Sequence, residues 1–153
     1  MEFSLVMKYY CLDGKLVDPA EAQISIKDRC VLYGEGLFET IRVHKGRALF
    51  IDKHLERLNK SCTFLCIDVD IAKVRGAVND FIAANEIDEG SLRLTVTGGY
   101  SKEAGQGTGA TVNSGAEGTF FITGQMGRKY LQEDYSRGYT GFISSIKRID
   151  SFL

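Results

Sequence analysis

Apolar and polar side chains alternate along several short stretches of the chain, which is the period-two pattern of strands with one buried face. Asp13-Gly14 is a residue pair typical of a tight hairpin turn, and a second turn lies around Lys45-Gly46. Because close turns join neighbours, most of the strands should pair antiparallel. The expected strands cover residues 8–12, 15–17, 23–27, 38–43, 48–51, 91–97, 119–123 and 139–146.

Apolar residues at three- and four-residue spacing predict a consecutive pair of helices after the second hairpin. The first covers about residues 53–66, with Asp52 as its candidate N-cap. The second starts after the candidate N-cap Asp70 and ends near Asn85. Strands outnumber helices in this pattern. It therefore predicts an α+β fold, a mostly antiparallel sheet with a consecutive pair of helices packed on one face.

The composition excludes several classes of protein. With 153 residues, 44% of them hydrophobic and 25% charged, the chain has the size and composition of one ordinary globular domain. Lysine and arginine total 19 against 20 acidic residues, and the basic residues are scattered, so we expect no nucleic-acid partner. No apolar run approaches the length of a membrane span, and the N-terminus lacks the pattern of a secretory signal. We therefore expect a cytoplasmic protein without a membrane partner.

Two patterns could be taken for ligand sites. Cys62 and Cys66 lie one helical turn apart, but no pair of histidines accompanies them, so we expect no metal site. Within the glycine-rich segment 98–118, residues 105–110 match the loose G-x-G-x-x-G/A pattern of dinucleotide-binding turns. The residues that follow lack helical periodicity, so we interpret the segment as a flexible surface loop between two antiparallel strands.

Two short stretches carry candidate chemistry. Residues 33–40 read YGEGLFET, where two glycines around an acid predict a tight backbone turn. The alternative is a structural loop whose aromatic residues belong to the core. Residues 54–58 read HLERL, which places His54 and Arg57 on one helix face. An arginine there could bind a phosphate or a carboxylate as a fixed fork, and the alternative is a surface salt bridge.

The stretch DRCVLYGEGLFETIRV, followed after a short spacer by HLERL, resembles the class IV aminotransferase family. These fold-type IV enzymes depend on pyridoxal 5′-phosphate (PLP). They include branched-chain aminotransferases, D-amino acid aminotransferases and aminodeoxychorismate lyase. The resemblance begins with the first hairpin and continues through LRLTVTGGYS to FISSIKRIDSFL. It implies that the α+β fold is the small N-terminal domain of these enzymes.

The resemblance also implies roles for four residues. Arg57, in the H-x-x-R-L position, would bind the phosphate of PLP. Tyr33, which opens the Y-G-x-G turn, and Phe38 would line the substrate pocket. Arg93 matches a position where some relatives place a pocket arginine, and its alternative is a solvent-facing strand residue. D-amino acid enzymes typically read T-R-G where this chain reads Thr97-Gly98-Gly99, which counts against a D-amino acid specialist.

In this family the lysine that forms the Schiff base with the cofactor lies a few residues after the segment that FISSIKRID resembles. Lys147 falls within that strand pattern, where relatives carry a basic residue without catalytic duty, so we nominate no catalytic residue in the chain. We expect residues 1–124 to form the small domain and 125–135 an interdomain connector. Residues 136–153 would be the first strand of a truncated PLP-binding domain.

Three hypotheses for function follow. The first is the N-terminal part of a PLP-dependent aminotransferase, which transfers an amino group from an α-amino acid to a 2-oxo acid. The resemblance implies a homodimer, and the chain alone should be inactive and bind PLP weakly or not at all. The second is part of an aminodeoxychorismate lyase, which uses the same cofactor to eliminate pyruvate. The third is a non-catalytic module for binding or dimerisation. Tyr33 and Phe38 favour branched-chain or aromatic substrates.

Overall fold

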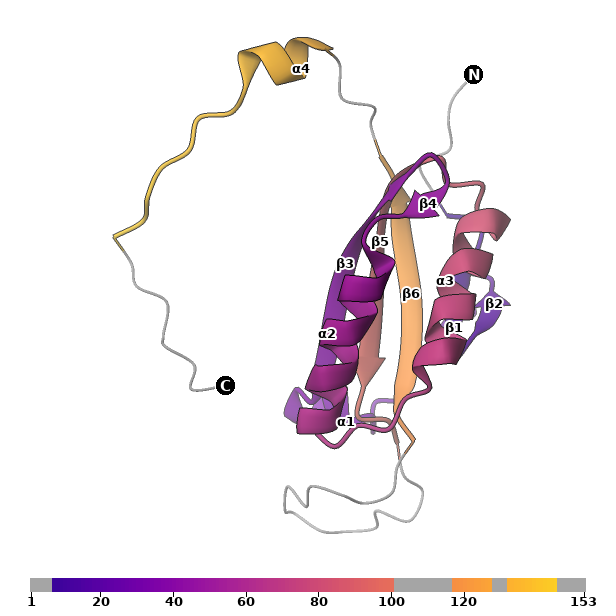
Figure 1. Cartoon of the computed structure of the whole chain (residues 1–153). Coiled ribbons are helices and arrows are strands. Elements are labelled where there is room, and N and C mark those ends of the chain that lie inside the picture. Colours follow the sequence, from indigo (N-terminus) through magenta and orange to yellow (C-terminus); the bar gives the residue numbers. More distant parts are fainter. Residues whose placement is uncertain (1–6, 101–116, 128–131, 146–153) are drawn as a thin grey trace.

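A six-stranded antiparallel sheet forms the centre of the molecule (Figure 1). The computed structural model describes residues 7–100, 117–127 and 132–145. The strands lie in the order β2-β1-β6-β5-β3-β4, and every neighbouring pair in it is antiparallel. Their bounds are β1 Tyr10–Leu12, β2 Lys15–Val17, β3 Gly36–His44, β4 Arg47–Ala48, β5 Glu89–Thr97 and β6 Thr119–Met126. The helices are α1 Arg29–Tyr33, α2 Ile51–Phe64, α3 Ile71–Ala84 and α4 Gln132–Arg137.

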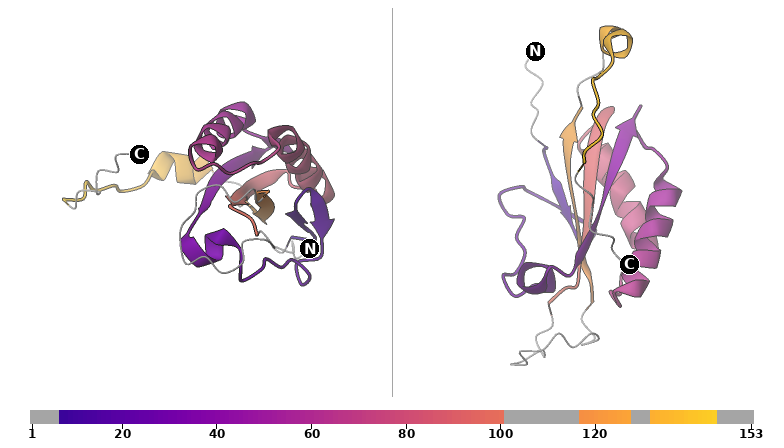
Figure 2. Two further views of the ribbon diagram at one scale, coloured as in Figure 1. Left: turned by 90° about the horizontal axis from the view of Figure 1, so that it is seen from below. Right: turned by 90° about the vertical axis from the view of Figure 1, so that its left-hand side faces the viewer.

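The two long helices, α2 and α3, cover one face of the sheet, and α1 with the segment before it lies on the other side (Figure 2). This arrangement confirms the predicted α+β fold with a consecutive pair of helices on one face. None of the helices in the described ranges is long and apolar enough to cross a membrane.

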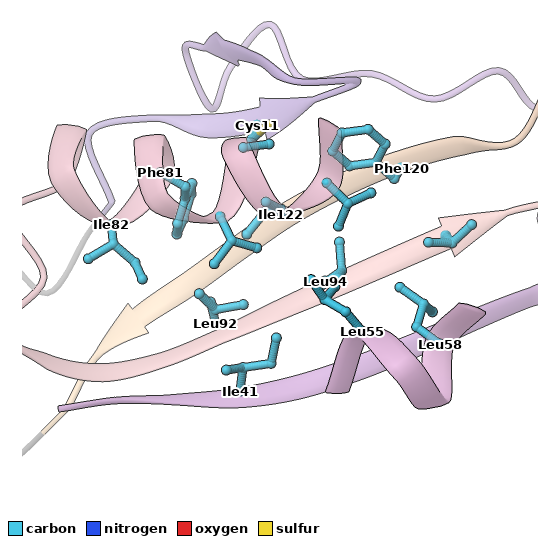
Figure 3. Close-up of a cluster of buried hydrophobic side chains, with 14 of the residues drawn as sticks. Cys11, Ile41, Leu55, Leu58, Phe81, Ile82, Leu92, Leu94, Phe120 and Ile122 are labelled. Atoms are coloured by element: carbon cyan, nitrogen blue, oxygen red, sulfur yellow. The ribbon is translucent and has the colours of Figure 1, made fainter. Parts of the chain in front are cut away.

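The hydrophobic core lies between the sheet and the helix pair (Figure 3). Burial alternates along β3 and β5, so every second side chain of these strands points toward the helices. The buried side chains include Ile41, Leu92, Leu94 and Ile122 from the strands, Leu55 and Leu58 from α2, and Phe81 and Ile82 from α3. Full burial of a large aliphatic or aromatic side chain contributes about 1.5–3 kcal/mol. This layer therefore fixes β3 against α2.

Local signals placed the second long helix correctly and the start of the first one wrongly. The Asp70 carboxylate accepts hydrogen bonds from the amides of Ala72 and Lys73, as expected of an N-cap. Asp52, in contrast, is not the N-cap of α2. The helix begins at Ile51 after Phe50, whose φ of 52° turns the chain out of β4. Asp52 lies in the first turn, where its negative charge still favours the helix dipole.

Three of the predicted strands differ most from the structure. Residues 22–25 have no regular structure and 26–27 form a turn, because the chain bends there into α1, and Ile26 is 80% exposed. The strand expected over 48–51 is only β4, since Phe50 already leads into α2. Residues 139–145 form no strand, and no strand of the described chain lies beside them to supply a hydrogen-bonded ladder (Figure 1).

Other predictions fall partly outside the described residues. Most of the glycine-rich segment, residues 101–116, does so, although β5 and β6 on either side of it pair antiparallel as expected. The end of the strand expected over 139–146 and the residues that follow it also lie outside the described residues. The division of the chain at 124–125 and at 135–136 stays a prediction.

Candidate functional site

An acidic side chain is buried between the sheet and α2. Glu39 shares the inward face of β3 with Ile41 and Val43, and only 4% of its surface is exposed. The Nε of Arg57 donates a hydrogen bond of 2.7 Å to Oε1 of Glu39, and the Nη2 of Arg57 donates one to Oε2. The Nδ1 of His54 lies 2.7 Å from the same Oε2. We call Glu39, His54 and Arg57 the Glu39 cluster.

The spacing of the helix explains why both partners reach one carboxylate. His54 and Arg57 are three residues apart in α2, so their side chains project from the same face of the helix. The core residues Leu55 and Leu58, on the adjoining face, hold α2 against the sheet. The predicted pairing of His54 and Arg57 on one helix face is therefore confirmed, and β3 supplies the acid between them.

Electrostatics keep the buried carboxylate ionised. Burial of Glu39 is the largest influence on its pKa and acts to raise it. The hydrogen bonds from Arg57 and His54, together with their charges, outweigh burial and lower the pKa of Glu39 below its ordinary value. The hydrogen bond with Glu39 in turn raises the pKa of the Arg57 guanidinium. Glu39 and Arg57 thus form a charged, hydrogen-bonded pair at neutral pH.

One edge of the Arg57 guanidinium stays available to a ligand. Nε and Nη2 face Glu39, whereas Nη1 makes no hydrogen bond within the part of the chain that the structure describes. The Arg57 side chain is 69% exposed. It borders a depression of about 420 Å³ that is lined by Phe50, Lys53, His54 and Arg57. A guanidinium, an ammonium and an imidazole around one hollow fit an anion of the size of a phosphate group.

Two more predicted residues meet on the opposite face of the sheet. Phe38 points away from α2 because it is next to Glu39 in β3, and it is 57% exposed. The guanidinium carbon of Arg93 lies 3.6 Å from the centroid of the Phe38 ring. Arg93 is exposed on β5, opposite Thr40, and forms no salt bridge with another described residue. This cation–π pair combines an apolar ring with a positive charge on one surface.

The two surfaces meet at a free edge of the sheet. β4 pairs only with Val43 and His44 of β3, so no described strand covers Gly36–Ile41 on that side. A ligand at this edge could reach Arg57 from one face and Phe38 from the other. The structure therefore places Phe38 and Arg93 in direct contact, whereas Arg57 lies on the opposite face of β3.

The turn that carries Tyr33 is fastened to the end of β5. Asp28 is buried, and its Oδ1 accepts a hydrogen bond of 2.7 Å from the amide of Cys30, which caps α1. Its Oδ2 accepts one of 2.7 Å from the hydroxyl of Thr97. Because Thr97 is the last residue of β5, this pair fixes the start of α1 to the sheet.

The two glycines of the predicted turn have different tasks. Gly34 has a φ of 72°, a conformation that favours glycine, and ends α1. A Cβ on Gly36 would lie 2.6 Å from the sulfur of Cys30. Arg29 makes two hydrogen bonds, of 2.6 and 2.7 Å, to Glu35 across this turn. Its guanidinium carbon lies 5.2 Å from the centroid of the Tyr33 ring, which is half exposed.

Comparisons with known proteins place the chain in a family. The sequence model described as "Amino-transferase class IV" matches residues 36–137. The chain belongs to the class IV aminotransferase family. The putative branched-chain-amino-acid aminotransferase of Methanocaldococcus jannaschii is 38% identical over 95 residues, which cover 61% of this chain and 33% of that protein. The chain thus spans about a third of the length of this curated relative.

Solved structures of the family agree with the fold. The 4-amino-4-deoxychorismate lyase of Pseudomonas aeruginosa superposes with a TM-score of 0.67 at 29% identity, over 84% of this chain and 44% of that one. A branched-chain amino acid aminotransferase from T.th., solved with pyridoxamine 5′-phosphate, has a TM-score of 0.72 at 18% identity, over 86% and 43%. The resemblance to class IV aminotransferases and the fold class expected from it are therefore confirmed.

Sequence reasoning did not single out Glu39, which the structure places between His54 and Arg57. The sequence did contain the necessary pattern. Side chains two residues apart in a strand lie on the same face, so Glu39 must point toward the core with Ile41 and Val43. If the inward face of this strand is packed against the predicted helix, Glu39 becomes a partner for Arg57. Phe50 and Lys53 carried no such signal, since their place beside Arg57 follows from the start of α2 at Ile51.

Proposed function

We propose that this chain forms the cofactor-phosphate side and part of the substrate surface of a PLP-dependent aminotransferase. The reaction is the transfer of an amino group from an α-amino acid to a 2-oxo acid. The observation that supports it most is Arg57, whose Nε and Nη2 are held by a buried carboxylate while the side chain borders a depression that Lys53 and His54 also line. Membership of the class IV family and 38% identity to a putative branched-chain aminotransferase support the reaction class.

The basic residues that line the depression fit the phosphate of PLP. Arg57 binds it as a permanently charged, planar fork, and Lys53 adds a second positive charge at the same depression. PLP, when bound, supplies an electron sink for the bonds at the α-carbon of the amino acid. The covalent attachment of the cofactor is assigned to no residue of this chain.

The opposite face of β3 contributes to substrate recognition in this proposal. Arg93 attracts the carboxylate that every α-amino acid and 2-oxo acid carries. Phe38, stacked on Arg93, and Tyr33 at the end of α1 offer apolar rings to the side chain of the substrate. Aromatic surface of this kind favours branched-chain or aromatic amino acids over small polar ones.

An aminodeoxychorismate lyase activity is the second candidate. The observation that favours it is the 29% identity to the P. aeruginosa lyase over 84% of this chain. The two reactions are separated on the holoenzyme by their products. A transaminase moves ¹⁵N from a labelled α-amino acid to a 2-oxo acid, whereas the lyase releases pyruvate from aminodeoxychorismate without that transfer. Finding neither product would support the non-catalytic alternative.

The phosphate role of Arg57 is tested by the affinity of the chain for pyridoxine 5′-phosphate relative to pyridoxine, which lacks the phosphate. A hydrogen bond to a charged group contributes about 1.5–3 kcal/mol, so we expect about a 10- to 100-fold preference for the phosphate ester. Arg57→Ala should remove this preference. The matched control is Arg75→Ala, because Arg75 is a helical surface arginine paired with Asp52 away from the depression. Equal affinities, or a preference that survives Arg57→Ala, would overturn the proposal.

A further inference from the structure

Glu39 makes contacts that a structural salt bridge alone would not need. Its two carboxylate oxygens receive three hydrogen-bond partners from one face of α2, and two of them belong to Arg57. Glu39 is 4% exposed whereas the Arg57 side chain is 69% exposed. A buried, rigid acceptor therefore holds an arginine that extends into solvent.

We propose that Glu39 is a positioning residue, which fixes the Arg57 guanidinium so that its Nη1 edge faces the depression and receives the cofactor phosphate. This inference rests on the proposed function of Arg57. A guanidinium carries five N–H donors. Two of them bind Glu39, so three remain for a ligand.

The physical reason is conformational entropy. An exposed arginine side chain samples many rotamers, and a ligand that binds a mobile arginine must immobilise it. In this protein Glu39 and the core packing of α2 have immobilised Arg57 before the phosphate arrives. His54 Nδ1 lies against the same carboxylate, which orients its ring beside the depression.

A second effect of Glu39 acts in the opposite direction and makes the inference testable by its sign. The carboxylate carries a negative charge next to the place where the dianionic phosphate would bind. Glu39→Gln removes that charge, so electrostatics alone predict tighter phosphate binding in the variant. Positioning predicts weaker binding, because the neutral amide holds Arg57 less firmly than a carboxylate does.

The experiment measures the dissociation constants of inorganic phosphate and of pyridoxine 5′-phosphate by NMR titration of the 153-residue chain. We expect Glu39→Gln to weaken binding about 3- to 10-fold, the range for immobilising one long side chain. In an Arg57→Lys background the same substitution should change affinity less than about 2-fold, because Glu39 acts through the guanidinium. A general loss of structure would weaken binding in both backgrounds.

The matched control is Glu89→Gln. Glu89 also binds an arginine and a histidine, since its Oε2 accepts a hydrogen bond of 2.7 Å from Arg42 and its Oε1 lies 2.6 Å from the Nδ1 of His44. This second Arg–His–Glu set lies at the other end of β3 and does not border the depression. Glu89→Gln should leave the phosphate affinity unchanged.

One further readout and one further variant separate the possible outcomes. The Nε–H resonance of Arg57 should be sharp and protected from exchange in the wild type and lost in Glu39→Gln, whereas Glu89→Gln keeps it. If Glu39→Gln fails to fold, Glu39→Asp retains the charge on a shorter stem, and it too should weaken binding. If Arg57→Ala abolishes phosphate binding but Glu39→Gln binds equally or more tightly, the positioning role is wrong and the proposed function stands. If Arg57→Ala has no effect, the proposed function itself fails.

Discussion

Replacing Asp28 with alanine should destabilise the fold and release the turn that carries Tyr33. Asp28 is 2% exposed, and its carboxylate accepts hydrogen bonds of 2.7 Å from the amide of Cys30 and from the hydroxyl of Thr97. Loss of an N-cap costs about 0.5–2 kcal/mol. A hydrogen bond to a charged acceptor contributes about 1.5–3 kcal/mol. Together these values predict a loss of about 2–5 kcal/mol in the free energy of unfolding.

The assay is urea unfolding followed by far-UV circular dichroism, with Asp18→Ala as the matched control. Asp18 also accepts a hydrogen bond, of 2.8 Å, from the amide two residues ahead, but it is exposed. We therefore expect Asp18→Ala to change stability by less than about 0.5 kcal/mol. If the two variants lose the same amount of stability, Asp28 does not tether α1 to β5 and the account of the Tyr33 turn is refuted.

Three other predictions concern packing, pH and thiol reactivity. Gly90→Ala should destabilise the protein by about 1–3 kcal/mol, because a Cβ there would lie 2.5 Å from a backbone carbonyl oxygen of β6. Gly76 lies in open space within α3, so Gly76→Ala should stabilise the protein by about 0.5–1 kcal/mol in the same urea assay. If both substitutions changed the free energy of unfolding in the same direction, the packing described for these glycines would be contradicted. Because the pKa of Glu39 is lowered in the folded state, its stabilising contribution is complete above its ordinary value of 4.5 and is lost as the pH falls through the lowered pKa. The stability advantage of the wild type over Glu39→Gln should therefore stay constant from about pH 7 to about pH 4.5 and shrink as the pH falls below that value, and an advantage that never shrinks would argue against it. Burial raises the pKa of the Cys62 thiol to about 11, so a thiol reagent should modify the exposed Cys66 first and Cys62 only on unfolding, as peptide mapping by mass spectrometry can show.

Features that depend on neighbouring residues could be predicted from the sequence. The turn at Asp13-Gly14 has positive φ at both residues, as the pair suggested. Asp70 caps α3, and the apolar spacing of both long helices matched their buried faces. Each of these signals lies within a few residues of the structure that it predicts, which is why the fold class followed from pattern alone.

Features that depend on distant partners could not be predicted in the same way. α1 has only five residues, too few to show a helical periodicity in the sequence. Its N-cap Asp28 accepts a hydrogen bond from Thr97, which is distant in the sequence. The alternation of Ile24 and Ile26 imitated a strand, although these residues pair with none of the strands that the structure describes. For the site, the sequence suggested Arg57 but not the carboxylate that holds it, because that contact joins β3 to α2.

A crystal structure of the chain with pyridoxine 5′-phosphate tests the central claim most directly. The account predicts a phosphate oxygen at about 2.7–2.9 Å from the Nη1 of Arg57, while Nε stays hydrogen-bonded to Glu39. A phosphate bound elsewhere, or an Arg57 that leaves Glu39 to reach it, would contradict the account.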